Sequence, residues 1–364
     1  MIALLAPVLV VGCGGSHRVA AQPTVAPRPV ERHLALISAH DGVKRCCVPD
    51  LILNAAVPDG FGGWFVGSSS IGLAHLLADG HLDPAWGTRS TRRVIVSLLV
   101  RSGSRLYVED SGRIEAFDVE SGARLWVSET IGARVLPTVS ARVLALAASS
   151  SAVYLAGNFT RVGGVPRRGV AALDARTGRL LDWQTPALLN GDGPDAANAY
   201  FNALALAGSR IYVGGVFSAI GRRPRSGLAA LDASTGALLP WHPVNAGGDL
   251  DVIFVAHGEV ATAGYDSFGV FDARTGHRLS WTSRLGGFAT TFGSDRRLLY
   301  LGGGLRNGFN SADGHPRHNL AAINLTTGRF TRWGPNLALF VTVGAIVPSG
   351  DQILVLGSFT NSIG

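Results

Sequence analysis

A set of polar residues places carboxylate, amide, guanidinium and imidazole groups in the segments that separate apolar runs. These residues are Asp192, Asp195, Asn198, Arg222, Arg223, His242, Asp249 and His318. Such a mixture could bind a sugar, a carboxylate ligand or a protein loop through hydrogen bonds and ion pairs. Calcium takes about six to eight oxygen ligands, more than Asp192 and Asp195 supply. We predict these residues as ligand-binding candidates, with solvated loop surface as the alternative, and we predict no metal site.

The cysteines are Cys13, Cys46 and Cys47, and their spacing does not favour a zinc site. The sequence has no Cys-x-x-Cys pair, no His-Glu-x-x-His motif and no histidine-rich tract. Cys46 and Cys47 are adjacent, and in an exported protein such a pair is expected to be oxidised. We therefore predict either a vicinal disulfide between them or a plain structural role.

The first residues of the chain predict export. Residues 2–11 form an apolar run interrupted only by Pro7, which suits a signal peptide but falls short of the roughly 20 residues of a membrane-spanning helix. The run ends in Val10-Val11-Gly12-Cys13, which resembles the bacterial lipobox, in which the cysteine takes a diacylglycerol. It departs from that pattern because it has no basic residue before the apolar run. We predict a lipoprotein signal peptide over 1–13 with lipidation at Cys13, and an ordinary cleaved signal is the alternative.

Composition favours one repetitive domain. The chain has 364 residues, above the usual size of a single compact core, with 48 glycines and 47% hydrophobic residues. The segment 14–31 contains prolines without apolar periodicity, which predicts a flexible tether before a single domain over 32–364. The net charge is +7, but Lys44 is the only lysine and the arginines are spread along the chain. Because there is no concentrated basic patch with aromatic residues, we expect no nucleic-acid partner.

A repeated turn followed by tryptophan organises this domain. Asp-x-x-Thr-Gly, or Asn in place of Asp, is followed by Trp five residues after the glycine at 174–183, 232–241, 272–281 and 324–333. Looser copies end at Trp126 and Trp86. The turn glycines from Gly42 to Gly328 are 38 to 58 residues apart, which suits four short strands and their turns in each unit.

Within each unit the residues predict specific structural roles. The aspartate can accept hydrogen bonds from its own turn, and the glycine can adopt positive φ. The tryptophan offers a flat surface for docking on the next unit. Gly-Gly steps such as Gly214-Gly215 suit places where neighbouring strands crowd. A Pro-Arg pair precedes the turn at the same offset in three units, which indicates a structural arginine at Arg167, Arg225 and Arg317.

The two ends of the domain complement each other. Residues 353–360 match the inner strands of other units and lack an outer half, whereas residues 34–42 align with the outer half at 320–328. Joining them makes one unit of mixed origin and removes open sheet edges. We therefore predict an all-β, seven-bladed β-propeller of four-stranded antiparallel blades, closed by pairing N-terminal and C-terminal strands in one blade; the alternative is an incomplete last repeat.

The Asp-x-x-Thr-Gly-x-x-x-x-Trp units resemble the tryptophan-docking repeats of quinoprotein (PQQ-like) propellers. The Tyr-x-Gly-Gly-x-Phe segments and residues 79–86 are similar to repeats of secreted bacterial propellers of uncharacterised role. The resemblance covers residues 32–364. In alcohol-oxidising quinoproteins an adjacent cysteine pair lies against the cofactor, but here Cys47 falls in the tryptophan position of an outer strand, away from the axis.

We expect a non-catalytic, membrane-tethered scaffold that binds an envelope or extracellular protein or a glycan. It would be a monomer, anchored to the outer face of the membrane or envelope only by its lipid. No residues match the metal ligands and catalytic aspartate of the quinoprotein dehydrogenases, so no cofactor is predicted. The alternative is such a dehydrogenase, with PQQ and calcium, or another propeller enzyme with its site at the axial channel mouth.

Overall fold

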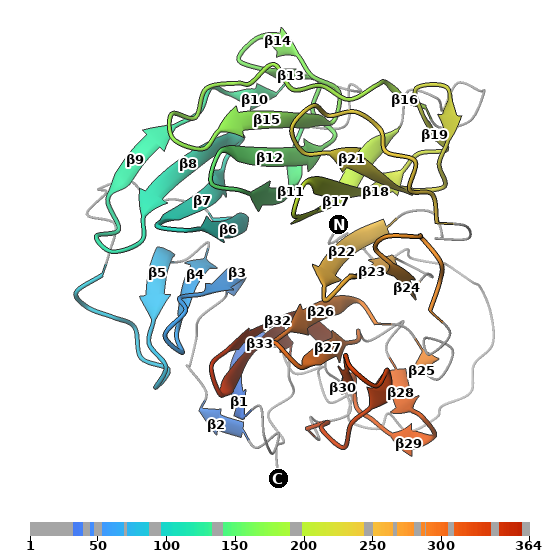
Figure 1. The fold of residues 1–364 in the computed structure, drawn as a ribbon. Helices are drawn as coiled ribbons and strands as arrows, with labels where there is room; N and C mark the ends of the chain where they lie inside the picture. The colour runs from blue at the N-terminus through green and yellow to red at the C-terminus, as the bar shows by residue number, and fades with distance from the viewer. Residues whose placement is uncertain are drawn as a thin grey trace, which may run out of the picture. The chain divides into compact units, whose positions relative to one another are not determined.

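The structure is a computed structural model, and every regular element that it describes is a β-strand (Figure 1). It describes residues 32–38, 44–46, 53–68, 71–86, 96–132, 141–189, 199–243, 250–264, 268–279, 285–287, 289–304, 309–335 and 342–358. All of them belong to one compact unit, Glu31–Gly364. In these ranges there is no helix with the length and apolarity needed to cross a membrane. Signal-peptide residues 1–13 with Cys13, the tether 14–31, and Cys47 lie outside the described residues.

The strands form antiparallel sheets that follow the repeat. The larger sheets, each given in its hydrogen-bonded order, are as follows: β3 (Leu53–Pro58), β4 (Trp64–Ser68) and β5 (Gly72–Leu76); β6 (Leu98–Ser102), β7 (Arg105–Asp110), β8 (Arg113–Asp118) and β9 (Arg124–Val127); β11 (Val143–Ala148), β12 (Ala152–Gly157) and β15 (Val170–Asp174); β17 (Tyr200–Ala207), β18 (Arg210–Val216) and β21 (Leu228–Asp232); β22 (Leu250–Ala256), β23 (Glu259–Gly264) and β24 (Phe268–Asp272); β26 (Thr291–Ser294), β27 (Leu298–Gly302), β30 (Leu320–Asn324) and β31 (Arg329–Phe330); β2 (Lys44–Cys46), β1 (Arg32–Ser38), β33 (Gln352–Ser358) and β32 (Thr342–Ser349).

The outermost segment is less regular than the predicted fourth strand. In the sheets that begin at β3, β11, β17 and β22 it is joined to its neighbour by an isolated bridge, as between Leu173 and Leu180. One further main-chain bond follows, from Leu181 N to Ala172 O at 2.9 Å. At Trp86 and Trp241, the tryptophan at the end of the segment bonds to the next sheet, so there the segment leaves its own sheet after these contacts.

Three small sheets connect consecutive repeats, and the sequence had not indicated them. In each, a short strand that follows one large sheet pairs with a hairpin inserted between the second and third strands of the next. Their members are β10 (Ile131–Gly132), β13 (Arg161–Val162) and β14 (Val165–Pro166); β16 (Leu188–Leu189), β19 (Ala219–Ile220) and β20 (Arg223–Pro224); β25 (Leu285–Gly287), β28 (Phe309–Ala312) and β29 (His315–Pro316).

One sheet is built from both ends of the domain. Strand β1 pairs with β33 along its whole length, with Leu34 opposite Leu356 and Leu36 opposite Leu354. Strand β33 also pairs with β32, so an N-terminal strand lies beside two strands from the C-terminal end. This is the pairing that the complementary half-repeats predict.

The hydrophobic core is divided among the junctions between sheets. One edge strand of each large sheet lies beside the corresponding edge strand of the next: β3 with β6, β6 with β11, β11 with β17, β17 with β22, β22 with β26, β26 with β32, and β32 with β3 (Figure 1). A Cβ on Gly214 of β18 would stand 3.1 Å from Leu250 Cβ and 3.0 Å from Ile253 Cδ1 of the next sheet. The predicted crowding at the Gly-Gly step is therefore confirmed: β18 packs against the next sheet with no room for a side chain at Gly214.

Candidate functional site

The repeated tryptophans hold neighbouring sheets together, as predicted. Trp126 Nε1 and Tyr107 OH, from one sheet, both donate to Ala175 O of the next, at 3.2 and 3.1 Å. Their ring centroids are 5.8 Å apart. Tyr212 and Trp241 form a similar pair, but they donate to two adjacent carbonyls at the end of β24, Ala273 O and Asp272 O. In Trp183, by contrast, the ring is buried and its Nε1 has no hydrogen-bond partner.

The repeated aspartates stabilise their own turns. Asp174 Oδ1 accepts hydrogen bonds from Arg176 N at 3.1 Å, from Thr177 N at 2.8 Å and from Thr177 Oγ1 at 2.8 Å. The Thr177 hydroxyl and these amides lower the pKa of Asp174 from its usual value. Asn324 accepts from the same positions of its own turn, so the role needs an oxygen acceptor and no charge.

The repeated Pro-Arg pairs are structural too. Arg167 donates from Nη1 to Pro166 O at 2.9 Å and from Nη2 to Leu181 O at 3.1 Å. Arg225 and Arg317 make the equivalent bonds. The prediction of a structural arginine is confirmed: each side chain joins the carbonyl of its preceding proline to the outer segment of the same repeat.

His75 breaks the repeat. It lies on β5 opposite Phe65 of β4, whereas the matching positions opposite Tyr107, Tyr154 and Tyr212 are all alanine. These alanines are Ala116, Ala172 and Ala230. The other sheets have an alanine methyl group at this position. A largely buried imidazole loses hydration there, so it needs hydrogen-bond partners from the protein.

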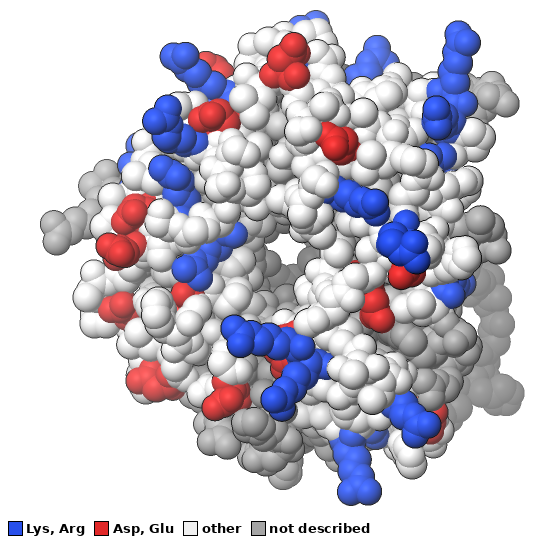
Figure 2. All heavy atoms as spheres, in the orientation of Figure 1, with Lys and Arg blue, Asp and Glu red and all other residues white. Residues whose placement is uncertain are grey.

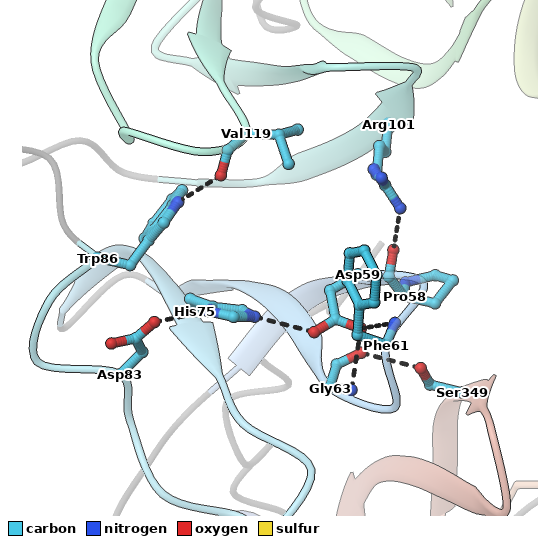
Figure 3. Close-up of polar contacts among 10 residues, drawn as sticks. All are labelled: Pro58, Asp59, Phe61, Gly63, His75, Asp83, Trp86, Arg101, Val119 and Ser349. Carbon is cyan, nitrogen blue, oxygen red and sulfur yellow. Dashed lines mark hydrogen bonds and ion pairs between the residues drawn. The ribbon is translucent and has the colours of Figure 1, made fainter.

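Two carboxylates supply those partners from opposite sides (Figure 3). His75 Nε2 lies 3.0 Å from Asp59 Oδ2, and His75 Nδ1 lies 3.0 Å from Asp83 Oδ2. Phe65 stacks on the imidazole with centroids 4.8 Å apart. The hydrogen bond from His75, followed by that from the Ala85 amide, lowers the pKa of Asp83.

Asp59 shapes the loop between β3 and β4, residues 59–63, which we name the Phe61 loop. Asp59 Oδ1 accepts from Phe61 N at 2.6 Å and from Gly63 N at 2.9 Å. Arg101 Nη1 donates to Pro58 O at 3.2 Å, and Ser349 Oγ donates to Gly63 O at 3.0 Å (Figure 3). Both neighbouring sheets therefore bind the loop at its base.

The Phe61 loop presents an aromatic ring to solvent. Phe61 is 91% exposed, and the next most exposed large hydrophobic residue in the described ranges is Leu125, at 46%. The loop is also longer than its counterparts, such as residues 103–104, 208–209 and 257–258. It therefore extends beyond the neighbouring turns and carries its ring on a base fixed by hydrogen bonds.

The arrangement of Asp59, His75 and Asp83 does not suit a metal ion. The imidazole lies between the two carboxylates, with each ring nitrogen bonded to one of them, so the groups do not surround a common point. More generally, the part of the chain that the structure describes contains no group of three His, Cys, Asp or Glu side chains that could hold a metal.

The structure reaches only part of the ligand-binding set predicted from the sequence. Asp192, Asp195, Asn198 and Asp249 lie outside the described residues. Arg222 and Arg223 lie exposed in the β19–β20 hairpin, His242 is exposed after Trp241, and His318 is half-buried after Arg317. Within the described ranges, no hydrogen bond or ion pair joins these arginines to either histidine. Cys46 is in β2, and its pairing with Cys47 stays a prediction.

Sequence reasoning missed Asp59, Phe61, His75 and Asp83, although a signal was present. Leu73-Ala74-His75-Leu76 departs at one residue from Leu228-Ala229-Ala230-Leu231, and a histidine in an alanine position marks the exception. The partners carry no such signal, because Asp59 and Asp83 stand in turns where aspartate is common.

Comparison with known proteins places the chain in a family. The family model for outer membrane protein assembly factor BamB matches residues 64–214 and 166–339, which together span about three quarters of the chain. BamB from Moraxella catarrhalis is 16% identical, with 89% of this chain and 91% of that one covered and a TM-score of 0.49. The WD40 β-propeller domain of Doa1 is 9% identical, with 91% and 94% covered and a TM-score of 0.56. No curated protein matches the sequence. The all-β fold is that of a β-propeller with PQQ-like repeats, and the chain belongs to the family of outer membrane protein assembly factor BamB.

Proposed function

We propose that this protein is a non-catalytic propeller scaffold that binds another protein outside the cytoplasm, and that the Phe61 loop is one of its contact sites. Two observations support the scaffold role. The family to which the chain belongs is described as an assembly factor for outer membrane proteins. The repeated tryptophans, aspartates and arginines join strands and sheets. The residues that depart from the repeat are therefore the ones available to bind a partner.

The exposure of Phe61 is the observation that carries the proposal. An aromatic ring that is 91% exposed gains hydrophobic free energy when a partner covers it. Aromatic side chains are enriched among the residues that dominate binding at protein interfaces. Because hydrogen bonds to Asp59 already order the loop, binding would lose little conformational entropy.

The surface charge indicates less about the chemistry of the partner. On the face drawn in Figure 2, arginine and acidic side chains are scattered among neutral ones, and no continuous area of one sign covers the described residues there. Electrostatic attraction over that face would therefore be weak and screened by salt. This favours recognition through shape and an aromatic anchor.

The scaffold that we propose is a closed ring of seven blades. The side-by-side contacts of these edge strands support it, since they lead from β3 through β26 and β32 back to β3. The pairing of β1 with β33 supports closure at the mixed sheet. The face in Figure 2 is also hollowed near its centre, as expected where inner strands surround an axis.

Tethering to the membrane is a further part of the proposal. Lipidation of Cys13 would hold the propeller at the membrane. As an extended tether, residues 14–31 would allow more distance between the lipid and the propeller than a folded segment of the same length. Mass spectrometry of the exported protein should find diacylglycerol on the N-terminal cysteine. Cys13→Ser should move the protein from the membrane fraction to the soluble fraction, and membrane retention of this variant would contradict the anchor.

Site-specific crosslinking in intact cells would test the contact. A photoreactive phenylalanine analogue replaces Phe61 in one variant and Leu125, which is 46% exposed on β9, in the control. We expect a discrete protein adduct at position 61 and none at 125. Phe61→Ala should then weaken binding of the purified adduct partner by about tenfold or more. Unchanged affinity, or equal adducts at both positions, would refute the contact.

The quinoprotein alternative has a separate test. Purified exported protein is scanned for absorbance before and after addition of PQQ with calcium, and dye reduction is measured with an alcohol as substrate. Saturable quinone binding with dye reduction would overturn the non-catalytic proposal, and our expected result is neither.

A further inference from the structure

The hydrogen bonds around His75 require a particular protonation state. Each ring nitrogen lies 3.0 Å from a carboxylate oxygen, and an ionised carboxylate can only accept hydrogen bonds. A neutral imidazole has one N–H donor and one lone pair, so it can satisfy only one of the two carboxylates. The imidazolium has two donors and satisfies both.

We propose that His75 is a proton-dependent latch: when protonated it joins Asp59 of the Phe61 loop to Asp83 of the segment that carries Trp86, and when neutral it releases Asp83. The latch is a property of this sheet and does not depend on what binds the Phe61 loop.

Burial decides which carboxylate is released. The Asp59 side chain is 7% exposed, and the Asp83 side chain is 22% exposed. An unpaired carboxylate costs more free energy where water cannot reach it. The single remaining N–H therefore stays with Asp59, and Asp83 turns toward solvent when the imidazole presents its lone pair.

Release of Asp83 affects a docking segment. Asp83 Oδ1 accepts from Ala85 N at 2.9 Å and so forms the turn before Trp86. Trp86 Nε1 then donates to Val119 O of the next sheet at 2.6 Å. The counterparts of His75 in the matching sheets are alanines, which do not titrate. Among these sheets, only here would protonation of a side chain change the contacts of the docking segment.

In the described residues, no hydrogen bond or ion pair joins His75 to the other charged groups of the adjacent segments. Arg101 of β6 donates to Pro58 O and Gly103 O. Asp79 and His81, in the turn after β5, pair with each other at 3.3 Å and are mostly exposed. Asp351, in the turn before β33, is exposed. From β4 and the docking segment, the uncharged rings of Phe65 and Trp86 face the imidazole.

Amide hydrogen exchange of the full chain between about pH 5 and pH 9 tests the latch. Rates are divided by those of the unfolded chain at each pH. We expect protection of the Ala85 amide to fall about tenfold or more as the pH rises, while the Phe61 and Gly63 amides keep theirs. A pH-independent pattern would overturn the proposal, as would loss at Phe61 and Gly63 in place of Ala85.

Matched variants separate the latch from general loosening. His75→Gln can donate to one carboxylate at every pH, so Ala85 should be unprotected throughout and the step should vanish. Asp83→Asn can accept from the imidazolium or donate to the neutral ring, so protection should persist at high pH. His81→Gln, at the exposed pair, should keep the wild-type step. A step that survives in His75→Gln, or disappears in His81→Gln, would refute the assignment to His75.

Discussion

Replacing Gly178 with alanine should destabilise the contact between two sheets through a defined clash. Gly178 has φ +71°, and a Cβ there would stand 2.5 Å from Trp126 Cε3 and 2.8 Å from Cζ3. The indole cannot move away freely, because its Nε1 is bonded to Ala175 O. The substitution therefore strains the turn and also forces the docked ring out of place.

The two costs can be separated with a second glycine. The left-handed conformation costs an alanine about 1–2 kcal/mol, and overpacking a close contact adds about 1–3 kcal/mol. Gly178→Ala should then lower the free energy of unfolding by about 2–5 kcal/mol. Gly314 has φ +77° and nothing within 4 Å of its would-be Cβ, so Gly314→Ala should cost only the first part.

Urea unfolding followed by far-ultraviolet circular dichroism measures both variants. Combining Gly178→Ala with Trp126→Leu should recover part of the loss, because the smaller side chain vacates the position of the clash, and a double-mutant cycle isolates this coupling. If Gly178→Ala costs no more than Gly314→Ala, or the cycle shows no coupling, the docking interpretation of the tryptophan is wrong.

Three other substitutions follow from the repeated contacts. Arg225→Met should lower the free energy of unfolding in urea by about 2–4 kcal/mol, because it removes the buried guanidinium that donates to two main-chain carbonyls. Arg222→Met, on the exposed part of the same hairpin, should change it by no more than about 0.5 kcal/mol. Burial, then a hydrogen bond to a carboxylate, raises the pKa of Tyr300, so Tyr300→Phe should leave the alkaline absorbance titration of the folded protein unchanged; a smaller amplitude would contradict this. Hydroxyl and amide donors lower the pKa of Asp232 below 3.8, so its stabilisation is present above that pH and is lost as the pH falls through the lowered value. Asp232→Asn, which copies the natural Asn324, should reduce the fall of the urea midpoint between about pH 5 and pH 3.

The repeat predicted most of the fold because its residues have local physical roles. The turn aspartate, the glycine and the tryptophan at fixed spacing each require one environment, and the structure provides it at Asp174, Gly178 and Trp126. The small sheets were beyond prediction, since strands of two residues such as Ile131–Gly132 have no detectable periodicity. Their partners also lie in the next repeat, so the sequence pattern of a single unit does not reveal the pairing.

The candidate site was sought in long loops, where ligand-binding residues often lie, and was found in a strand and two turns. His75 could have been recognised by comparing the repeats position by position. Its pairing with Asp59 could not, because Asp59 lies in the β3–β4 loop and His75 on β5, and the approach of the two side chains depends on the conformation of the irregular Phe61 loop. The exposure of Phe61 likewise follows only from the loop conformation, since phenylalanine is usually buried.

The pairing of β1 with β33 makes the order of synthesis matter. A ribosome delivers residues 32–38 long before residues 352–358, so the side of β1 that pairs with β33 has no partner while every intervening strand is made. During that interval the main-chain donors and acceptors on that side are open to other strands, including those of a second nascent copy. Cells that make this protein should therefore depend on holding factors that cover the early strand, and loss of such factors should leave aggregates that contain full-length chains.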